Sequence, residues 1–485
     1  MSAAPGARPV TDAPSPAASI RWAQAPDGSQ RARVPVPVDH RDPDGPAIDL
    51  AVVRHPAGDR DARLGALLVA PDDPGSSGIA LAGALVKALP PAVTARFDVI
   101  GFDHRFSGES APLQWGLDQR EIFWVFHQSE SFAAEVRFQA EIAAKAAERS
   151  LAVLPHITTR NIARDIDVIR RALGEERICL LGHNYGSYVA AVYCQLFGAR
   201  ADRVILDSVL SPDWVWRGLF GNFARNCEAT LRRWCARAAR PAGPLGDTPE
   251  QVRDAFEEVL SKAGAGGITL PGVPVPLDDQ FLRVLAMMLL SSQRSHAALE
   301  DVVRSARTGE PLRAATQQLI GSMFAVPRDA STAAAQMAIL CGDAAWPRAL
   351  EEYESASEDA SEFMGRALLG VKAGAFWPVQ PLEPPTAFGP ATAAGVLLVQ
   401  AEQDMFTAAV GATQLRNLLG ERARLVRVRG MTEHRVFPFV GHAGVNAVAE
   451  EFLTTGRLPD ADIAMDADTA VDADTAVDAE RTREP

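Results

Sequence analysis

One short segment in the first half of the chain has the pattern of a strand, a tight turn and a helix. Residues 178–181 are an apolar run typical of a buried strand, and residues 187–197 have helical spacing. Between them, residues 182–186 read Gly-His-Asn-Tyr-Gly. Such a turn holds its central residue in a strained backbone conformation, and in many enzymes that residue is a nucleophilic serine. Here it is Asn184, whose carboxamide has no proton to lose at neutral pH and is a very poor nucleophile.

The elements that must position this turn alternate between strands and helices along much of the chain. Strands are predicted at 32–39, 48–54, 64–70, 97–102, 178–181, 203–207, 395–401 and 424–429. Helical patterns separate most of them, including 79–89, 116–150, a segment starting at Thr158 or Thr159, and 445–454. This alternation predicts an α/β fold, with a mostly parallel sheet covered by helices on both faces.

The domain organisation follows from changes in composition. Residues 1–19 are rich in Ala and Pro and predict a disordered leader, and residues 211–385 are dominated by long helical patterns that predict an inserted helical cap. The core is then expected in two parts, at 20–210 and 386–459. Residues 460–485 are acidic, repeat Asp-Ala-Asp-Thr-Ala-Val and predict a disordered tail.

Composition excludes several classes of function. The chain has 485 residues, is 47% hydrophobic and carries a net charge of −13, which argues against nucleic acid or an anionic membrane as a partner. No apolar window is long enough for a membrane span, the leader does not read as a secretory signal, and no metal, nucleotide or flavin motif appears. We therefore expect no cofactor and no metal site. Five scattered cysteines predict a reduced, cytoplasmic protein.

Several separated stretches carry a resemblance to a known family. They are residues 36–39 (Val-Pro-Val-Asp), 97–105 (Phe-Asp-Val-Ile-Gly-Phe-Asp-His-Arg), 154–159 (Leu-Pro-His-Ile-Thr-Thr), 182–186, 234–236 (Trp-Cys-Ala), 376–378 (Phe-Trp-Pro) and 397–404 (Leu-Leu-Val-Gln-Ala-Glu-Gln-Asp). In this order they resemble the α/β-hydrolase-fold tripeptidyl aminopeptidases and prolyl iminopeptidase-like exopeptidases of actinobacteria. The resemblance covers about residues 20–459. It implies an α/β-hydrolase core with a helical cap, acting on a peptide or other small carbonyl compound.

The resemblance also implies where the remaining groups of the site lie. Acyl transfer in this fold uses Ser, Asp and His in that chain order. The resemblance places the acid at Asp404 and the base at His434, which is flanked by Glu433 and Arg435 where the family has glycines. His442 is the alternative base, although its spacing to the final helix fits less well.

The segment expected to stabilise an oxyanion departs from the family as well. The family has a Gly-Gly-Pro-Gly run, whereas this chain has Asp72 and Asp73 before Pro-Gly75. Carboxylates that face inward there oppose a developing negative charge, or act as an acid or base, or bind a substrate amine, whereas carboxylates that face solvent do none of these. The N–H of Tyr185 is the expected surviving donor, and the side chains of His183 and Tyr185 are expected to line the pocket.

Three readings of Asn184 remain open. In the first, Asn184 orients a substrate carbonyl or water while His434 and Asp404 act as base and orienting acid. In the second, the site is catalytically silent and the protein is a binding scaffold. In the third, Asn184 deamidates to a nucleophilic aspartate. The third is disfavoured because Tyr185 follows. We expect an atypical enzyme of specialised metabolism, with isomerisation, epimerisation, cyclisation or elimination as non-hydrolytic options. The alternatives are the scaffold and a residual amide or ester hydrolase.

The cysteine pattern differs from that of secreted relatives. The resemblance implies disulfides near the start, around Cys235 and before Phe376, and one partner of each later pair is missing here. This supports the expected reducing compartment and a substrate made inside the cell. Cys179 and Cys194 lie in apolar patterns and are expected to pack rather than react.

Overall fold

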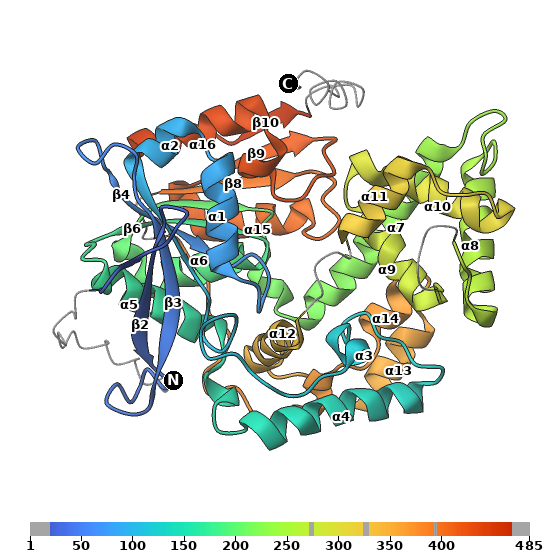
Figure 1. The fold of residues 1–485 in the computed structure, drawn as a ribbon, viewed down its shortest axis with the longest axis horizontal. Helices are drawn as coiled ribbons and strands as arrows, with labels where there is room; N and C mark the ends of the chain where they lie inside the picture. Colours follow the sequence, from blue (N-terminus) through green and yellow to red (C-terminus); the bar gives the residue numbers. More distant parts are fainter. Residues whose placement is uncertain (1–19, 271–275, 324–328, 392, 394, 468–485) are drawn as a thin grey trace, which may run out of the picture.

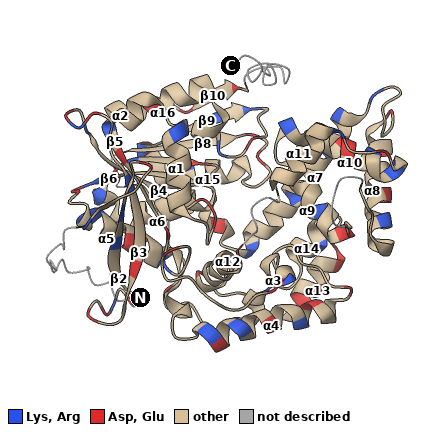
Figure 2. Cartoon of the chain, viewed as in Figure 1, with Lys and Arg blue, Asp and Glu red and all other residues tan. Residues whose placement is uncertain are grey.

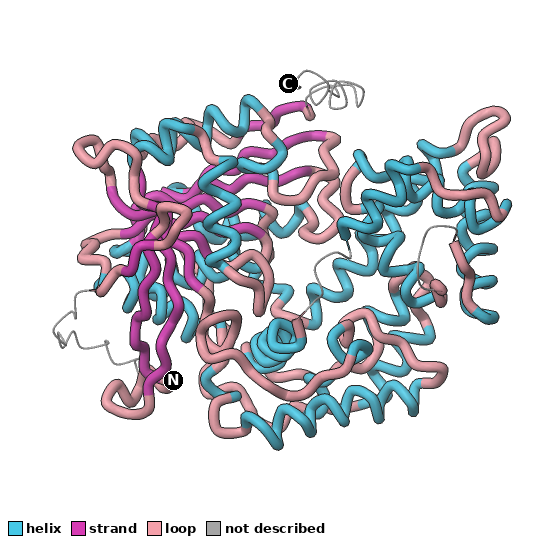
Figure 3. The backbone as a smooth tube through the Cα atoms, in the orientation of Figure 1, coloured by secondary structure: helices cyan, strands magenta, loops and turns pink. Residues whose placement is uncertain are grey.

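The computed structural model describes residues 20–270, 276–323, 329–391, 393 and 395–467. The expected leader at 1–19 and most of the expected tail therefore lie outside the described residues. In the described part, the strands gather in one region and a group of helices forms a second region beside it (Figure 1). The separation of strand-rich and helix-rich regions is plain in Figure 3.

Within the described residues the strands form one sheet of ten, in the order β1-β2-β3-β5-β4-β6-β7-β8-β9-β10. They are β1 (Ala23–Gln24), β2 (Gln30–Pro37), β3 (Ala47–His55), β4 (Gly65–Ala70), β5 (Phe97–Phe102), β6 (Ile178–His183), β7 (Ala201–Asp207), β8 (Gly395–Ala401), β9 (Ala423–Arg429) and β10 (Ile463–Asp466). Neighbours from β5 to β10 are parallel, and β1, β2 and β3 add to that edge antiparallel. The predicted mostly parallel sheet is confirmed.

The central strands are buried on both faces, which is why they read as continuous apolar runs. Every residue of β4, β5, β6 and β8 is buried. One face of the sheet packs against α1 (Gly78–Ala88), α2 (Pro91–Arg96) and α16 (Ala443–Thr455). The other packs against α5 (Thr159–Ala172), α6 (Tyr185–Phe197) and α15 (Ala409–Leu419).

The helical region is built mainly from the chain between β7 and β8. Its helices are α7 (Arg217–Ala238), α8 (Pro249–Gly266), α9 (Asp279–Leu290), α10 (His296–Thr308), α11 (Ala314–Met323), α12 (Ala330–Gly342), α13 (Leu350–Glu358) and α14 (Gly365–Leu369). Two helices from the predicted core segment 20–210, α3 (Gln119–Ile122) and α4 (Phe132–Ser150), pack here as well. α3 contacts α12, and α4 contacts residues 373–376 (Figure 1).

The expectation of disorder from residue 460 onward is wrong for residues 463–466, which form β10 parallel to β9. Ile463 and Met465 alternate with exposed residues and pack on the core. The neighbouring acids have basic partners. Asp462 pairs with Arg416 at 2.9 Å, and Asp466 pairs with Arg429 at 2.8 Å. The segment just before the acidic repeat thus has a short alternating pattern that suits an edge strand.

Charges and cysteines are arranged as in an ordinary globular protein. Lys and Arg are interspersed with Asp and Glu over both regions (Figure 2). All five cysteines are free and buried, as the packing role expected for Cys179 and Cys194 requires. In the ranges that the structure covers, no helix has both the length and the apolar character needed to cross a membrane.

Candidate functional site

The turn between β6 and α6 has the geometry that the sequence predicts. Asn184 has φ 48° and ψ −118°, and its N–H donates to the carbonyl of Asp207 at 3.0 Å. The flanking glycines are sterically required. A Cβ on Gly182 would lie 2.1 Å from the carbonyl oxygen of Gly186, and one on Gly186 would lie 2.9 Å from the Ala70 carbonyl oxygen. The turn therefore has the strained conformation of a nucleophile elbow, with asparagine at the position of the nucleophile.

The carboxamide of Asn184 is held by the loop that follows β4. Its Nδ2 donates to Asp73 Oδ1 at 2.7 Å. Ser187, three residues on, donates its hydroxyl to the Asn184 carbonyl at 2.5 Å and is buried. Ser187 therefore stabilises the turn and does not replace the missing nucleophile.

Asp404 and His434 form a complete acid–base pair at the ends of β8 and β9. The Nδ1–H of His434 donates to Asp404 Oδ2 at 2.8 Å. Asp404 is buried and also accepts the Thr407 hydroxyl at 2.7 Å and the Phe406 N–H at 2.9 Å, so its orientation is fixed. The ring of Phe406 meets His434 edge-on, with centroids 5.0 Å apart. No residue in the described part of the chain bonds the Nε2 of His434, which leaves that nitrogen free to exchange a proton.

The environment of His434 favours its protonated form. Burial acts against the charged ring, but the Asp404 carboxylate, supported by Asp72, outweighs burial and raises the pKa of His434 above its usual value. The neutral ring that can accept a proton is therefore formed only at a higher pH than for a free histidine.

The alternative base, His442, lies elsewhere. Its Nδ1 accepts the N–H of Val445 at 3.2 Å, which caps the start of α16. Its Nε2 contacts the carbonyl oxygen of Asp466 in β10 at 3.0 Å. The structure pairs His434, and not His442, with Asp404.

Neither aspartate of the loop after β4 simply faces solvent. Asp72 Oδ2 pairs with Arg435 Nη1 at 2.9 Å, while Asp73, although mostly exposed, binds Asn184. The N–H of Asp73 donates a hydrogen bond to Ser76 Oγ at 3.0 Å. Both carboxylates therefore lie against groups of the site, where they oppose rather than stabilise an oxyanion.

Gly75 and His104 fix the path of this loop. Gly75 has φ 86°, and a Cβ there would lie 2.3 Å from the carbonyl oxygen of Thr332 in α12. The N–H of Gly75 donates to Nε2 of His104 at 2.8 Å. Burial lowers the pKa of His104 to about 4. His104 is thus neutral, and it links the loop to the end of β5.

The side chains of His183 and Tyr185 are framework groups, which corrects the expectation that they line the pocket. His183 is fully buried and its Nε2–H donates to the Phe437 carbonyl at 2.6 Å. Tyr185 is buried, with its hydroxyl 2.9 Å from Thr159 Oγ1. Both side chains are buried and bonded to other framework groups, so neither is exposed to a bound substrate. The main-chain N–H of Tyr185 remains the expected oxyanion donor.

Sequence reasoning missed Asp207 and Ser208, and it missed the contact through which Arg435 helps to organise the site. Arg435 has φ 61° and binds Asp72. Asp207 and Ser208 are fully buried at the end of β7 and accept N–H groups of the segment after His434. A polar pair directly after a buried strand adjacent to β6 is the signal that could have found them.

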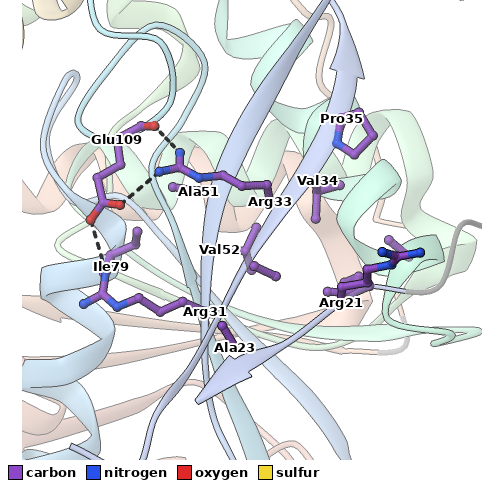
Figure 4. A pocket seen from close by; sticks show the side chains of 13 residues that line it. Arg21, Ala23, Arg31, Arg33, Val34, Pro35, Ala51, Val52, Ile79 and Glu109 are labelled. Atoms are coloured by element: carbon purple, nitrogen blue, oxygen red, sulfur yellow. Dashed lines mark hydrogen bonds and ion pairs between the residues drawn. The ribbon is translucent and has the colours of Figure 1, made fainter. Parts of the chain in front are cut away.

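One large cavity of the described structure lies away from this acid–base pair. No cluster of three His, Cys, Asp or Glu side chains suited to a metal ion occurs among the residues that the structure describes. A cavity of about 600 Å³ lies beside β2 and β3, where Arg31 and Arg33 contact Glu109 (Figure 4). Its lining includes none of the predicted site residues.

Comparisons with known proteins identify the family of the chain. Residues 74–245 match the α/β hydrolase fold family, and residues 361–465 match the TAP-like protein family. The chain is 32% identical over 451 residues to a tripeptidyl aminopeptidase of Streptomyces lividans, covering 89% of this chain and 82% of the relative. It is 28% identical over 463 residues to the serine protease Hip1 of Mycobacterium tuberculosis, covering 90% and 86%.

Among solved structures, a proline iminopeptidase-related protein from Thermus thermophilus aligns over 87% of this chain and 97% of its own, with 15% identity and a TM-score of 0.35. The family assignment rests on the sequence relatives. The chain belongs to the tripeptidyl aminopeptidase-related family of the α/β-hydrolase superfamily.

Proposed function

We propose that the protein is an enzyme that acts on a carbonyl group of a short peptide or peptide-like small molecule, without forming a covalent intermediate at residue 184. His434 moves the proton and Asp404 orients the His434 ring. The observation that carries this proposal is the 2.8 Å hydrogen bond between His434 and Asp404, made with a buried and fully bonded acid, beside an elbow that holds asparagine. The peptide class is taken from the relatives named for aminopeptidase and protease activity.

The chemistry left to such a site is proton transfer. Neutral His434 can accept a proton from a bound water or from an acidic position of the substrate, and can return it to the product. A base at this position can serve hydrolysis by an activated water. It can equally serve a non-hydrolytic step such as epimerisation, isomerisation, cyclisation or elimination. A role in specialised metabolism inside the cell is part of the proposal.

A silent binding scaffold is the second candidate, because two contacts join the loop after β4 to the rest of the site. Asp73 holds Asn184 and Asp72 holds Arg435, so the region expected to receive an oxyanion is bridged in the free protein. A scaffold predicts tight binding of a peptide with no change in its mass or configuration.

The test is incubation of the full chain with a tripeptide and peptide-ester library in D₂O and in H₂¹⁸O, followed by mass spectrometry. Hydrolysis adds ¹⁸O to the new carboxyl group, and proton exchange at carbon adds deuterium. We expect one of these changes with the unmodified protein and a loss of about 10²- to 10⁴-fold in His434→Gln. Turnover that appears only after Asn184→Ser supports the scaffold instead.

The pH dependence of this turnover follows from the raised pKa of His434. The neutral base forms as pH rises, so we expect kcat/KM to increase with pH through a midpoint above 6.5, the ordinary value for histidine. Asp404→Asn removes the main charge that stabilises the imidazolium, so its midpoint is expected to be lower and its rate smaller. A rate that falls as pH rises through this range contradicts a general-base role.

A further inference from the structure

Asp207 is hydrogen-bonded both to the turn that carries Asn184 and to the loop that carries His434. It ends β7 and is fully buried. Its main-chain carbonyl accepts the N–H of Asn184 at 3.0 Å. Its carboxylate accepts the N–H of Val436 at 3.1 Å through Oδ1 and the N–H of Phe437 at 2.5 Å through Oδ2. One residue therefore joins the elbow to the segment that directly follows His434.

The neighbouring residues complete this attachment. Ser208 Oγ accepts the N–H of Arg435 at 2.8 Å and donates to Asp207 Oδ1 at 3.0 Å. From β6, His183 Nε2–H donates to the carbonyl of Phe437 at 2.6 Å. Three consecutive N–H groups after His434 are thus bonded to the end of β7, and one carbonyl is bonded to β6.

The attachment uses a carboxylate without a basic side-chain partner. In the described residues no Lys or Arg pairs with Asp207, and its bonded donors are two main-chain N–H groups and a hydroxyl. Burial raises the pKa of Asp207, while His183 and the N–H donors act in the opposite direction. A buried carboxylate is costly to retain and needs several well-aligned donors, so its geometry restricts the segment strongly.

These hydrogen bonds hold the loop next to a residue with an unfavourable backbone conformation. Arg435 has φ 61°, in the left-handed region that residues with a side chain seldom adopt. The bond from its N–H to Ser208 holds it there. Because the direction of the His434 side chain depends on the backbone that follows it, a looser segment turns the ring away from Asp404.

We propose that Asp207 is a positioning residue, which sets the orientation of His434 toward Asp404 and toward the elbow through the backbone of residues 435–437. Its effect on turnover rests on the proposed function. The positioning itself is a property of the free protein and is measurable without substrate.

The variant Asp207→Asn keeps the size of the side chain but turns one acceptor into an NH₂ group, which meets a backbone N–H and loses that bond. The matched control is Asp301→Asn. Asp301 is equally buried and accepts the N–H of Arg313 at 2.8 Å, but it belongs to α10 in the helical region. Both variants remove a buried carboxylate that holds a loop, and only one of the loops carries His434.

The readout is the titration of His434 in the full chain labelled with [¹⁵N]histidine, assigned by NMR with His434→Gln. The charged and titratable groups that face His434 are Asp404, Asp72 and His183, together with its neighbours Glu433 and Arg435. We leave all of them unchanged in this experiment. In Asp207→Asn the midpoint of His434 is expected to fall by about one pH unit, because the ring loses contact with Asp404.

Ser208→Ala removes only the acceptor for Arg435 and is expected to shift the midpoint in the same direction by a smaller amount. Asp301→Asn is expected to lower Tm and leave the midpoint unchanged. An unshifted His434 in Asp207→Asn, or an equal shift in Asp301→Asn, overturns the proposal. If Asp207→Asn does not fold, Ser208→Ala decides. Absence of turnover in the unmodified protein, with His434 still shifted in the variants, refutes the proposed function and leaves the positioning intact.

Discussion

Asn184→Ser is expected to react with a fluorophosphonate probe at residue 184, whereas the unmodified protein is expected to stay unlabelled there. The serine would stand on a turn already at φ 48° and ψ −118°, within a framework that retains the His434–Asp404 pair. The carboxamide of the unmodified protein offers no nucleophile. Labelling is measured by intact mass and mapped by peptide sequencing.

The single substitution is not expected to restore full reactivity. Asp73 loses its hydrogen bond to Asn184 when that residue is replaced, and its carboxylate still lies beside the position where negative charge develops. Asn184→Ser with Asp73→Gly is therefore expected to react about 10²-fold faster than Asn184→Ser alone. Adding His434→Gln to the double variant should return labelling to background. Covalent labelling of the unmodified protein on the elbow refutes the absence of a nucleophile.

Gly182→Ala is expected to lower the free energy of unfolding by about 3 kcal/mol. The added Cβ would lie 2.1 Å from the Gly186 carbonyl oxygen and 2.8 Å from the Ser187 nitrogen, both of them backbone atoms at the start of α6. The turn cannot open without moving α6 away from the sheet. Urea unfolding followed by circular dichroism measures the change.

The control is the same substitution at a glycine with room. A Cβ on Gly83, inside α1, meets nothing within 4 Å. Gly83→Ala is expected to stabilise the protein by up to about 1 kcal/mol, because alanine favours the helix. Equal unfolding midpoints for the two variants contradict the steric account of the elbow.

Much of the core was predictable because its strands are buried on both faces. The strands at 97–102 and 395–401 have the predicted bounds, and the N-cap of α5 is Thr158, one of the two residues expected to begin that helix. Continuous apolar runs and a capping hydroxyl are local sequence patterns, so they can be recognised without knowledge of the fold. The prediction was poorer for 116–150, where only α3 and α4 are helical.

The contacts that define the site could not be read in the same way. Asp207 meets residues more than 200 positions away, and Asp72 meets Arg435 across an even longer separation. The resemblance places the acid at Asp404 and the base at His434, each after a predicted strand. It does not say which N–H a buried carboxylate accepts, because that depends on how two loops pack in three dimensions.

The short strand β10 has a consequence for how the protein behaves at high concentration. It occupies the hydrogen-bonding side of β9 that would otherwise end the sheet, and the aspartates at its two ends, Asp462 and Asp466, pair with Arg416 and Arg429. An edge strand of only four residues with charged groups at both ends offers little backbone for another strand to pair with, which discourages two molecules from joining their sheets edge to edge. Residues 463–466 thereby limit edge-to-edge association of the protein at high concentration.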